Sequence, residues 1–464
     1  MMISLRDVLD GTEGTVRGEA GQELSFSRVW HDSREVEPGD LFVAIVGEHL
    51  DGHDFVRQAF ARGAAAAMVD RAHAAVLSDA GGPLIVVADT LDALQRLAAY
   101  WRARHNVQVV GITGSIGKSS TKEVVWAVVS QRFRALRSQR SFNNEIGLPL
   151  SLLAIGPDTE VVVLEIGGAY AFGEIERLAA IARPQIGVVT NVSHSHLSRM
   201  GSLEAIAATK AELPAAIPPD GSAVLNGDDV RVRAMADQCR GRVILYGLAP
   251  DCEVRAENVE SHGLDGITLD LLVADRRHHL HVPLLGQHSA HTVMAAVAVG
   301  LALGMSVEEM LPGFRDPSVQ LRLLTVPAVG GATVIDDSYN ANPTSSLAAL
   351  TLLGEISTRR RIAVFGDMLE LGSFEEEGHR MVGRRAAAVV DRLYTVGERA
   401  RIIAEEAVAY GLPASHVQAV STKRDLIDAL RDELAEGDYV LVKGSRGVRM
   451  EDVVAALRDR SRTE

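Results

Sequence analysis

The chain has little cysteine, no surplus of basic charge and no long apolar run. Only two cysteines, Cys239 and Cys252, occur among its 464 residues. They lack the paired spacing of a metal site, so they are expected to be reduced thiols in a cytoplasmic protein. The longest apolar stretch, near Ala295 to Met305, is too short to cross a bilayer. The polar start of the chain, with Arg6 and Asp7, argues against a signal peptide.

The balance of charge excludes another class of protein. Acidic residues number 61 and basic residues 47, which gives a formal charge of −14. A nucleic-acid-binding protein normally shows a basic surplus or a basic patch, and neither is present. The length predicts two to four domains, and an apolar content of 47% is enough for several cores. We therefore expect a monomer that acts on small molecules, without nucleic acid and without a membrane span.

What the chain does contain is a candidate phosphate-binding loop at residues 107–121, VQVVGITGSIGKSST. A buried strand is predicted first, then a glycine loop, then a helix beginning near Lys118. Inward-turned N–H groups, a positive helix end and a lysine are the features that bind phosphate, and the following hydroxyl can reach Mg²⁺. The residues expected to contact ATP here are Gly114, Ser115, Ile116, Gly117, Lys118, Ser119 and Ser120.

The match to a standard P-loop is incomplete, because Ile112 stands where the pattern has its first glycine. One alternative is an ordinary strand-to-helix turn that contains GKS. Another is a nucleotide-dependent switch or binding module, although no NKxD-type guanine reader is visible in the chain. A strand-end carboxylate adds to the enzyme interpretation. Glu165 is the one acid that interrupts the otherwise apolar run VVVLEI at residues 161–166, and a buried carboxylate usually has a partner.

Seven segments spread along the chain resemble those of the Mur ligases, the ATP-dependent amide ligases of cell-wall precursor synthesis. They are DSREVEPGDLFVAIVGEHLDGHDF, TGSIGKSS, NNEIGLP, TNVSHSHLSRMGSLEAIAATKAEL, GQHSAHTVMAA, DDSYNANPTS and VLVKGSRGVRMEDVV. The resemblance implies a three-domain α/β fold with a central P-loop ATPase-type domain and a C-terminal doubly wound, Rossmann-like domain. The expected boundaries are residues 1–105 for a UDP-sugar-binding domain, 106–314 for the ATP-binding domain and 315–464 for the last domain.

The C-terminal segments resemble the branch of the family that adds D-alanyl-D-alanine. The resemblance implies ATP-dependent joining of that dipeptide to UDP-N-acetylmuramoyl-tripeptide, through an acyl phosphate, in peptidoglycan synthesis. A ligase of the same superfamily with a different acceptor amine is the alternative. The sequence leaves open whether the tripeptide ends in lysine or diaminopimelate.

The resemblance also implies a metal and substrate site, with ATP and Mg²⁺ as cofactors. Ser119 and Glu165 would hold one Mg²⁺, while His196 and a carbamylated Lys210 would hold or orient a second. Lys118, Lys210 and His196 would be the catalytic residues. Ser33 and Arg34 would contact the sugar nucleotide, Asn143 and Asn144 would lie beside its phosphates, and Arg446 is the expected anchor of the dipeptide carboxylate.

The nucleotide contacts implied by the family lie farther along the chain. His288 opens an alanine-rich helix, where Ser289 and Thr292 replace asparagines common in the family. Arg322 is expected to approach the γ-phosphate, although Leu321 precedes it in place of glycine. The remaining expected contacts with the nucleotide are Asp337, Asn340 and Asn342.

Overall fold

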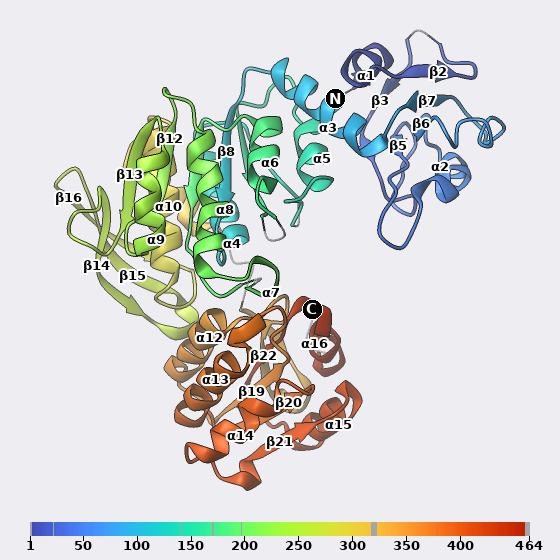
Figure 1. Cartoon of the computed structure of the whole chain (residues 1–464). Coiled ribbons are helices and arrows are strands. Elements are labelled where there is room, and N and C mark those ends of the chain that lie inside the picture. Colours follow the sequence, from blue (N-terminus) through green and yellow to red (C-terminus); the bar gives the residue numbers. More distant parts are fainter. Residues whose placement is uncertain are drawn as a thin grey trace.

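The computed structural model describes residues 2–21, 23–139, 141–168, 171–195, 197–316 and 323–459. They form three α/β domains in chain order, coloured blue, cyan through green to yellow, and orange to red in Figure 1. Their sheets have five, nine and six strands, and a two-stranded ribbon adjoins the first. The N-terminal and C-terminal domains lie on different sides of the central one (Figure 1). The predicted three-domain α/β architecture is confirmed.

The N-terminal domain is built on the sheet β2-β7-β6-β5-β4, in which β4 to β7 run parallel and β2 is antiparallel. The apolar run at residues 41–45 predicts a strand, which forms as β5, and the helix that the sequence predicts at residues 55–62 begins one residue later as α2. The bounds are β1 (Ile3–Ser4), α1 (Leu5–Thr12), β2 (Thr15–Arg17), β3 (Ser25–Phe26), β4 (Val29–Trp30), β5 (Leu41–Val43), α2 (Val56–Ala61), β6 (Ala66–Asp70), β7 (Leu84–Val87) and α3 (Thr90–Ala103).

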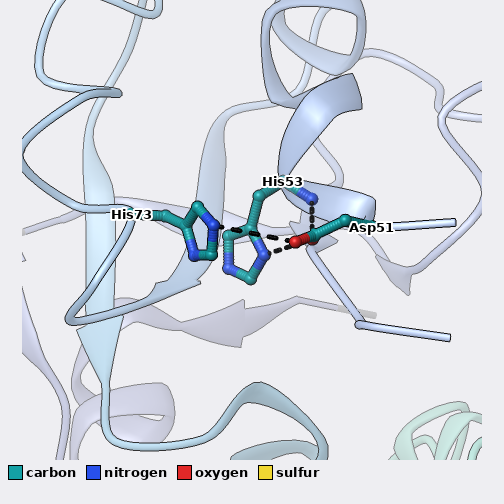
Figure 2. A group of neighbouring side chains, drawn as sticks. All are labelled: Asp51, His53 and His73. Atoms are coloured by element: carbon teal, nitrogen blue, oxygen red, sulfur yellow. Dashed lines mark hydrogen bonds and ion pairs between the residues drawn. The ribbon is translucent and has the colours of Figure 1, made fainter.

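A polar cluster in this domain joins the turn before α2 to the segment after β6. Asp51 caps the short 3₁₀ helix η1 (Gly52–Phe55) by accepting hydrogen bonds from the backbone N–H and the ring Nδ1 of His53, at 2.9 and 2.7 Å. The ring of His73 stacks on that of His53 with centroids 4.0 Å apart, and both rings adjoin the Asp51 carboxylate (Figure 2). The cluster therefore fastens two loops that are distant in sequence.

The central domain holds the nine-stranded sheet β16-β15-β14-β13-β12-β11-β8-β10-β9. Strands β8 to β14 run parallel, and the hairpin strands β15 and β16 are antiparallel. The strands are β8 (Gln108–Thr113), β9 (Ala135–Arg137), β10 (Val161–Glu165), β11 (Ile186–Val189), β12 (Ser222–Asn226), β13 (Arg242–Gly247), β14 (Val254–Ser261), β15 (Ile267–Val273) and β16 (Arg276–Val282). The helices are α4 (Lys118–Val129), α5 (Gly147–Leu153), α6 (Glu174–Ala182), α7 (Leu197–Met200), α8 (Leu203–Ala216), α9 (Val230–Arg233), α10 (Ser289–Ala302) and α11 (Val307–Met310).

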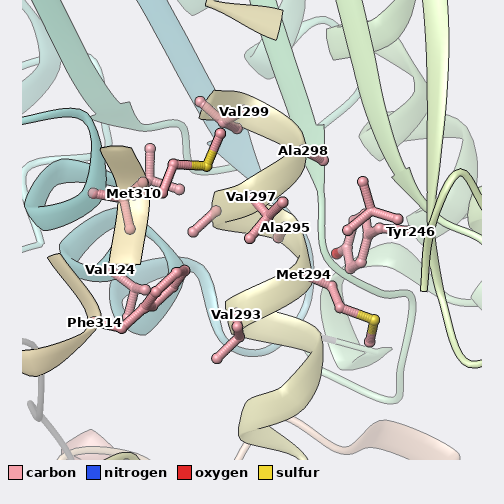
Figure 3. Close-up of a cluster of buried hydrophobic side chains, with 14 of the residues drawn as sticks. Val124, Tyr246, Val293, Met294, Ala295, Val297, Ala298, Val299, Met310 and Phe314 are labelled. Carbon is pink, nitrogen blue, oxygen red and sulfur yellow. The ribbon is translucent and has the colours of Figure 1, made fainter. Parts of the chain in front are cut away.

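The core of the central domain forms where α10 and α4 pack together on one face of the sheet. Val293, Val297 and Val299 of α10 are fully buried, and Val124 of α4 and Phe314 belong to the same cluster (Figure 3). Burying one such side chain is worth roughly 1.5–3 kcal/mol. The alanine-rich sequence of α10 lets it lie close to α4, because small side chains permit close helix contact.

The opposite face carries a second apolar cluster that continues into the N-terminal domain through α3. Trp101 donates its indole N–H to the carbonyl of Ile155 at 3.1 Å. The buried guanidinium of Arg102 donates to the carbonyl of Ala182 at 3.0 Å. The first two domains therefore share a core.

The third domain has the sheet β17-β18-β22-β19-β20-β21, parallel except for β17. Alternating segments of the sequence predict strands at residues 332–335, 361–365, 392–396 and 439–442, and helices at 345–356, 375–390, 399–410, 423–435 and 450–458. The structure forms a strand or an α-helix at each of these places. The strands are β17 (Leu324–Pro327), β18 (Thr333–Asp337), β19 (Arg360–Gly366), β20 (Arg392–Val396), β21 (Val417–Val420) and β22 (Asp438–Lys443). The helices are α12 (Pro343–Glu355), α13 (Glu375–Val389), α14 (Arg401–Ala409), α15 (Lys423–Glu433) and α16 (Glu451–Leu457).

One ring stack and several polar contacts connect the third domain to the central one. The ring of Phe374 stacks on that of His194, with centroids 4.0 Å apart. The polar contacts join Ser141 Oγ to Tyr339 Oη (2.5 Å), Asn342 Nδ2 to Ser195 Oγ (3.2 Å) and Arg199 Nη2 to Glu370 Oε1 (3.3 Å).

Candidate active site

A cavity of about 830 Å³ lies between the central and third domains. One wall contains the loop between β8 and α4, the end of β10 and the start of α10, and the other contains the segments after β18 and β22. The carboxyl ends of parallel strands are where such sheets bind ligands. The predicted residues that line the cavity are Ser115, Ile116, Gly117, Lys118, Ser119, Ser120, Asn143, Asn144, Glu165, Lys210, His288, Asp337, Asn340, Asn342 and Arg446.

The loop between β8 and α4 requires glycine at both ends. Gly114 has φ of +141°, and a Cβ there would lie 1.9 Å from Thr190 Oγ1. Gly117 has φ of +82°, in the left-handed region that favours glycine. Any side chain at Gly114 would displace the neighbouring strand end, so the tight course of the loop depends on this residue.

The same loop is braced from the end of β11. Asn191 accepts from the backbone N–H of Ile116 and donates to its carbonyl, both at 3.0 Å. Thr190 donates to that carbonyl at 2.7 Å. No described side chain caps the N-terminus of α4. The first N–H groups of this helix therefore face the cavity from a fixed loop, which is the arrangement that binds an anion.

Lys118 folds back over this loop. Its Nζ donates to the carbonyls of Gly114 and Ser115 at 2.8 and 3.3 Å. These bonds hold the ammonium at the mouth of the glycine loop, where it adds a full positive charge to the partial charge of the helix end.

Glu165 is the acidic residue of the cavity wall. It is 2% exposed, and its carboxylate accepts from Ser119 Oγ at 2.8 Å and from Asn143 Nδ2 at 2.7 Å. Both of these donors are neutral groups. Each carboxylate oxygen can accept more than one hydrogen bond, so lone pairs remain for a further partner. A buried carboxylate with neutral partners and spare lone pairs, next to a hydroxyl, is chemically suited to a hard cation such as Mg²⁺.

Lys210 lies on α8 and is buried against the same region. Its ammonium donates to the carbonyl of Gly168. Burial lowers the pKa of Lys210 to about 7, and the nearby charge of Lys118 adds to that effect, while Glu174 and Glu212 oppose it. A lysine with such a pKa is partly neutral near pH 7, so its amine can act as a nucleophile.

The start of α10 forms another part of the wall. Ser289 donates its hydroxyl to the carbonyl of Leu285 at 2.8 Å, so this donor is already used within the helix start. Thr292 and His291 line the cavity. The Nε2 atom of His291 lies 2.8 Å from Asp228 Oδ2, a contact that the sequence reading missed.

The third-domain wall uses much of its polar chemistry internally. Lys443, 1% exposed, donates to Asp337 at 2.5 Å and to the carbonyl of Asn340 at 2.9 Å. Asn342 caps α12 by accepting from the N–H of Ser345. These partners hold the segment after β18 in shape, so Asp337 and Asn342 are first of all structural residues of this wall.

Arg446 differs from the buried Lys443 on the same wall because its own side chain is 64% exposed. It pairs with Glu451 at 2.9 Å, and its guanidinium carbon lies 5.4 Å from the ring centre of Tyr339. Arg446 and Tyr339 both line the cavity. The exposed guanidinium of Arg446 at the cavity rim can still reach the carboxylate of a bound molecule.

Several predicted residues lie elsewhere. Ser33 and Arg34 are in the N-terminal domain, away from the cavity lining. Ser33 donates to Gln58 Oε1 at 2.9 Å. Arg34 pairs with Asp32 at 2.7 Å, and its hydrogen bonds lower the pKa of Asp32 to about 2. His196 and Arg322 fall outside the described residues.

The sequence reading missed the residues that support the site. Thr190, Asn191 and Ser138 were not assigned to the site, although Thr190 is the last residue of the strand that the sequence predicts at residues 186–190 and Asn191 follows it directly. The position of Asn191 at a strand end was a usable signal. Nothing local marks Ser138, because its partner Glu165 is distant in sequence.

The cluster of Asp51, His53 and His73 has ligand-type side chains, and their ligand atoms lie within 4.8 Å of one another. The hydrogen bonds argue against a metal. His53 Nε2 accepts from the backbone N–H of Asp70 at 3.1 Å, so Nδ1 carries the proton and donates to Asp51. Both nitrogens of His53 are engaged, and its ring is nearly parallel to that of His73, so their lone pairs do not converge.

Among the described residues, every helix is too short or too polar to span a bilayer.

Comparison with known families matches almost the entire length of the chain. The Mur ligase middle domain matches residues 112–300, the Mur ligase glutamate ligase domain matches residues 321–446, and the Mur ligase family catalytic domain matches residues 25–102.

Individual relatives give the same result. UDP-N-acetylmuramoyl-tripeptide--D-alanyl-D-alanine ligase of Bacillus subtilis (strain 168) is 33% identical, over 98% of each chain. The crystal structure of MurF from Acinetobacter baumannii superimposes with a TM-score of 0.85 at 28% identity, over 98% of each chain. MurF ligase from Thermotoga maritima, solved in complex with ADP, gives a TM-score of 0.77 at 27% identity and covers 92% of this chain and 96% of its own.

Proposed function

Because this chain belongs to the Mur ligase family, we propose that it joins D-alanyl-D-alanine to UDP-N-acetylmuramoyl-tripeptide with cleavage of ATP to ADP and phosphate, in peptidoglycan precursor synthesis. The observation that carries the proposal is similarity over 98% of the chain to a ligase of that name. ATP is the nucleotide of the P-loop cavity. ATP and the UDP-sugar are intracellular metabolites, so we place the reaction in the cytoplasm.

The chemistry explains why a cavity between two domains is needed. A carboxylate is a poor acyl donor, because oxide would have to leave. Transfer of the γ-phosphoryl group of ATP to the tripeptide carboxylate gives an acyl phosphate and ADP. The dipeptide amine then attacks the acyl carbon to form the C–N bond and loses one proton, and phosphate leaves with the electron pair of the broken C–O bond. Enclosure between domains keeps water from hydrolysing the acyl phosphate.

The phosphates of ATP would bind at the N-terminus of α4. The N–H groups of residues 117–120 supply donors, and Lys118 would exchange its loop carbonyls for the β- and γ-phosphates. The bracing of Ile116 by Asn191 keeps the loop in shape while the lysine moves.

We propose Mg²⁺ as the metal of this reaction, with Ser119 and Glu165 holding one ion and His196 with Lys210 holding or orienting a second. The buried Glu165 carboxylate, with neutral donors only, fits such a cation. When bound, Mg²⁺ neutralises charge on the transferred phosphoryl group. Lys210 fits carbamylation: its neutral amine would attack CO₂ and release one proton, and the product is an anion.

The remaining contacts are assigned by family likeness and position. His288, Ser289 and Thr292 would face the adenine, and Arg322, Asp337, Asn340 and Asn342 would border the phosphates or sugar of ATP. Ser33 and Arg34 would bind the UDP part of the substrate, and Asn143 and Asn144 would lie near its path toward the P-loop. Arg446 would bind the dipeptide carboxylate.

ADP release measured with ATP and UDP-N-acetylmuramoyl-tripeptide, with and without D-alanyl-D-alanine, tests the proposed function. We expect sustained release only with the dipeptide, and Lys118→Ala should lower it by at least about 10³-fold in a folded protein. Release driven equally by another acceptor amine would instead favour a different ligase of the superfamily.

The same assay tests Arg446. Loss of a charged hydrogen bond is worth roughly tenfold or more in affinity, so Arg446→Ala should raise the KM of the dipeptide by that factor. The KM of the UDP-tripeptide should stay nearly unchanged. A raised ATP KM with an unchanged dipeptide KM would assign the turn after β22 to the nucleotide.

A further inference from the structure

We propose that a charged group behind the P-loop, formed by the buried Lys122 and Glu123 with the partly exposed Arg137, positions the Glu165 carboxylate through Ser138. The inference rests on the proposed function, because Glu165 is assigned there as a Mg²⁺ ligand. None of the four residues behind Glu165 lines the cavity. They are therefore positioning residues.

The group begins on α4, one turn after the P-loop lysine. Lys122 is 1% exposed and Glu123 is 5% exposed. The Lys122 ammonium lies 3.1 Å from Glu123 Oε1, and Glu123 Oε2 lies 2.8 Å from Arg137 Nε. The guanidinium of Arg137 lies 3.5 Å from the ring centre of Trp126. Lys122 and Glu123 are thus paired away from solvent, and Arg137, whose side chain is 30% exposed, closes the group on its outer side.

Lys122 connects this group to Ser138. Its Nζ donates to the carbonyl of Ser138 at 2.8 Å. Ser138 follows β9 directly, is 1% exposed, and its own N–H donates to the carbonyl of Val163 at 3.0 Å. The residue is held from both sides, by α4 through its carbonyl and by β10 through its N–H.

Ser138 in turn fixes the backbone of Glu165. Its hydroxyl oxygen accepts the N–H of Glu165 at 3.2 Å. The ladder between β9 and β10 ends at the pair Arg137 and Val163, so a side chain continues it toward Glu165. The carboxylate direction therefore depends on a strand edge that α4, the helix of the P-loop, holds in place.

The physical reason for charge here is directional. Burying a lysine and a glutamate is costly, because both charges lose their hydration, and apolar side chains of similar size often stabilise a fold as well or better. An apolar side chain could fill the space but could not hold the Ser138 carbonyl at a set distance from α4. The group thus couples the helix that carries Lys118 and Ser119 to the strand end that carries Glu165.

The test uses Ser138→Ala, which removes only the hydroxyl. We expect a Mg²⁺ concentration for half-maximal activity raised by about 10-fold or more, the range found for residues that orient metal ligands. Calorimetry should show weaker ADP binding with Mg²⁺ and unchanged ADP binding without it. Ser138→Thr keeps the hydroxyl and should largely restore the Mg²⁺ dependence.

Ser151→Ala is the matched control. Ser151 is also buried in the central domain, and its hydroxyl donates within α5 to the carbonyl of Gly147 at 2.8 Å. The loss of unfolding free energy in Ser151→Ala should be similar to that in Ser138→Ala. Its Mg²⁺ dependence should stay that of the unchanged chain. In the double variant Lys122→Met with Ser138→Ala, the Mg²⁺ concentration for half-maximal activity should rise by less than the product of the two single-variant increases. The reason is that both residues act on Glu165 along one path.

A Mg²⁺ dependence within twofold of the unchanged chain in folded Ser138→Ala would overturn the inference while leaving the proposed function in place. If the unchanged chain ligates but binds ADP equally with and without Mg²⁺, the metal assignment and this inference both fail. If the unchanged chain does not ligate, the proposed function fails.

Discussion

The N-terminal domain and the cavity each contain a group of side chains that could bind a metal ion. The residue types alone do not show which group has the greater capacity for one. The cluster in the N-terminal domain offers Asp51, His53 and His73, the residue types typical of transition-metal sites. The group in the cavity offers Glu165 with two neutral neighbours, Ser119 and Asn143. By residue type the first is the stronger metal site.

Hydrogen bonding reverses that ranking. In the N-terminal cluster His53 uses both ring nitrogens, and Asp51 accepts two bonds from His53 at one oxygen. In the cavity the Glu165 carboxylate is buried without a cation among its described partners. Capacity for a metal therefore depends on unused lone pairs and uncompensated charge. Substitutions in the two groups should therefore have different effects on kcat and on the Mg²⁺ dependence of ADP binding.

The largest effect is expected at Glu165. Glu165→Gln keeps the shape and removes the charge, so kcat should fall by about 10³-fold and Mg²⁺ should no longer tighten ADP binding. Asp51→Asn, the corresponding change in the other group, should leave both quantities within about twofold. Steady-state rates and calorimetry measure them. Equal losses in the two variants would abolish the distinction between the groups.

Lys210 extends the cavity group, and its replacement should have the next largest effect. Lys210→Ala should lower kcat by about 10²-fold, with partial recovery on adding short carboxylic acids that supply the missing anion. In the unchanged chain, activity should rise with pH through about 7, because carbamylation needs the neutral amine. Mass spectrometry showing an unmodified lysine in the active enzyme would contradict this role.

Much of the fold and the inner wall of the cavity follows from the sequence. Val109 to Ile112 and Val161 to Leu164 are continuous apolar runs, and both form the buried strands that place Ser119 beside Glu165. Strand β16 was not predicted, because its sequence RRHHLHV is mostly polar and exposed. Strand β21 was missed for a similar reason, since none of its residues is buried.

The rest of the site depends on contacts between distant residues. Asp337 reads as a ligand residue after a strand, but Lys443 binds it across the sheet, 106 positions away. The pairing of Ser138 with Glu165 spans 27 positions. No local pattern reveals such pairs, because each requires two strands to be in register first.

A smaller effect is expected from His53, and it concerns stability alone. His53 is 3% exposed and both nitrogens are bonded, so His53→Ala leaves the N–H of Asp70 without its acceptor. We expect a loss of about 1–3 kcal/mol in unfolding free energy, with kcat and its Mg²⁺ dependence unchanged. Urea unfolding measures the loss. A fall in kcat that Zn²⁺ restored would show that the N-terminal cluster is a metal site after all.

The smallest effect is expected from replacing His73. The pH at which the replacement lowers stability shows whether the imidazole binds a proton or a metal ion. A hydrogen bond from Nδ1 to Asp70 raises the pKa of His73, and the Asp70 and Asp51 charges add to it. The neighbouring groups are Asp51, Asp54, Asp70 and His53. Because the folded pKa is the higher one, the stabilisation is complete below the unfolded pKa of about 6.5 and disappears as pH rises through the folded value. His73→Gln should therefore lower the urea midpoint at pH 5.5 and leave it unchanged at pH 9. A metal would give the reverse, since neutral imidazole binds metals, and a deficit that appeared only at high pH would favour an ion at this cluster.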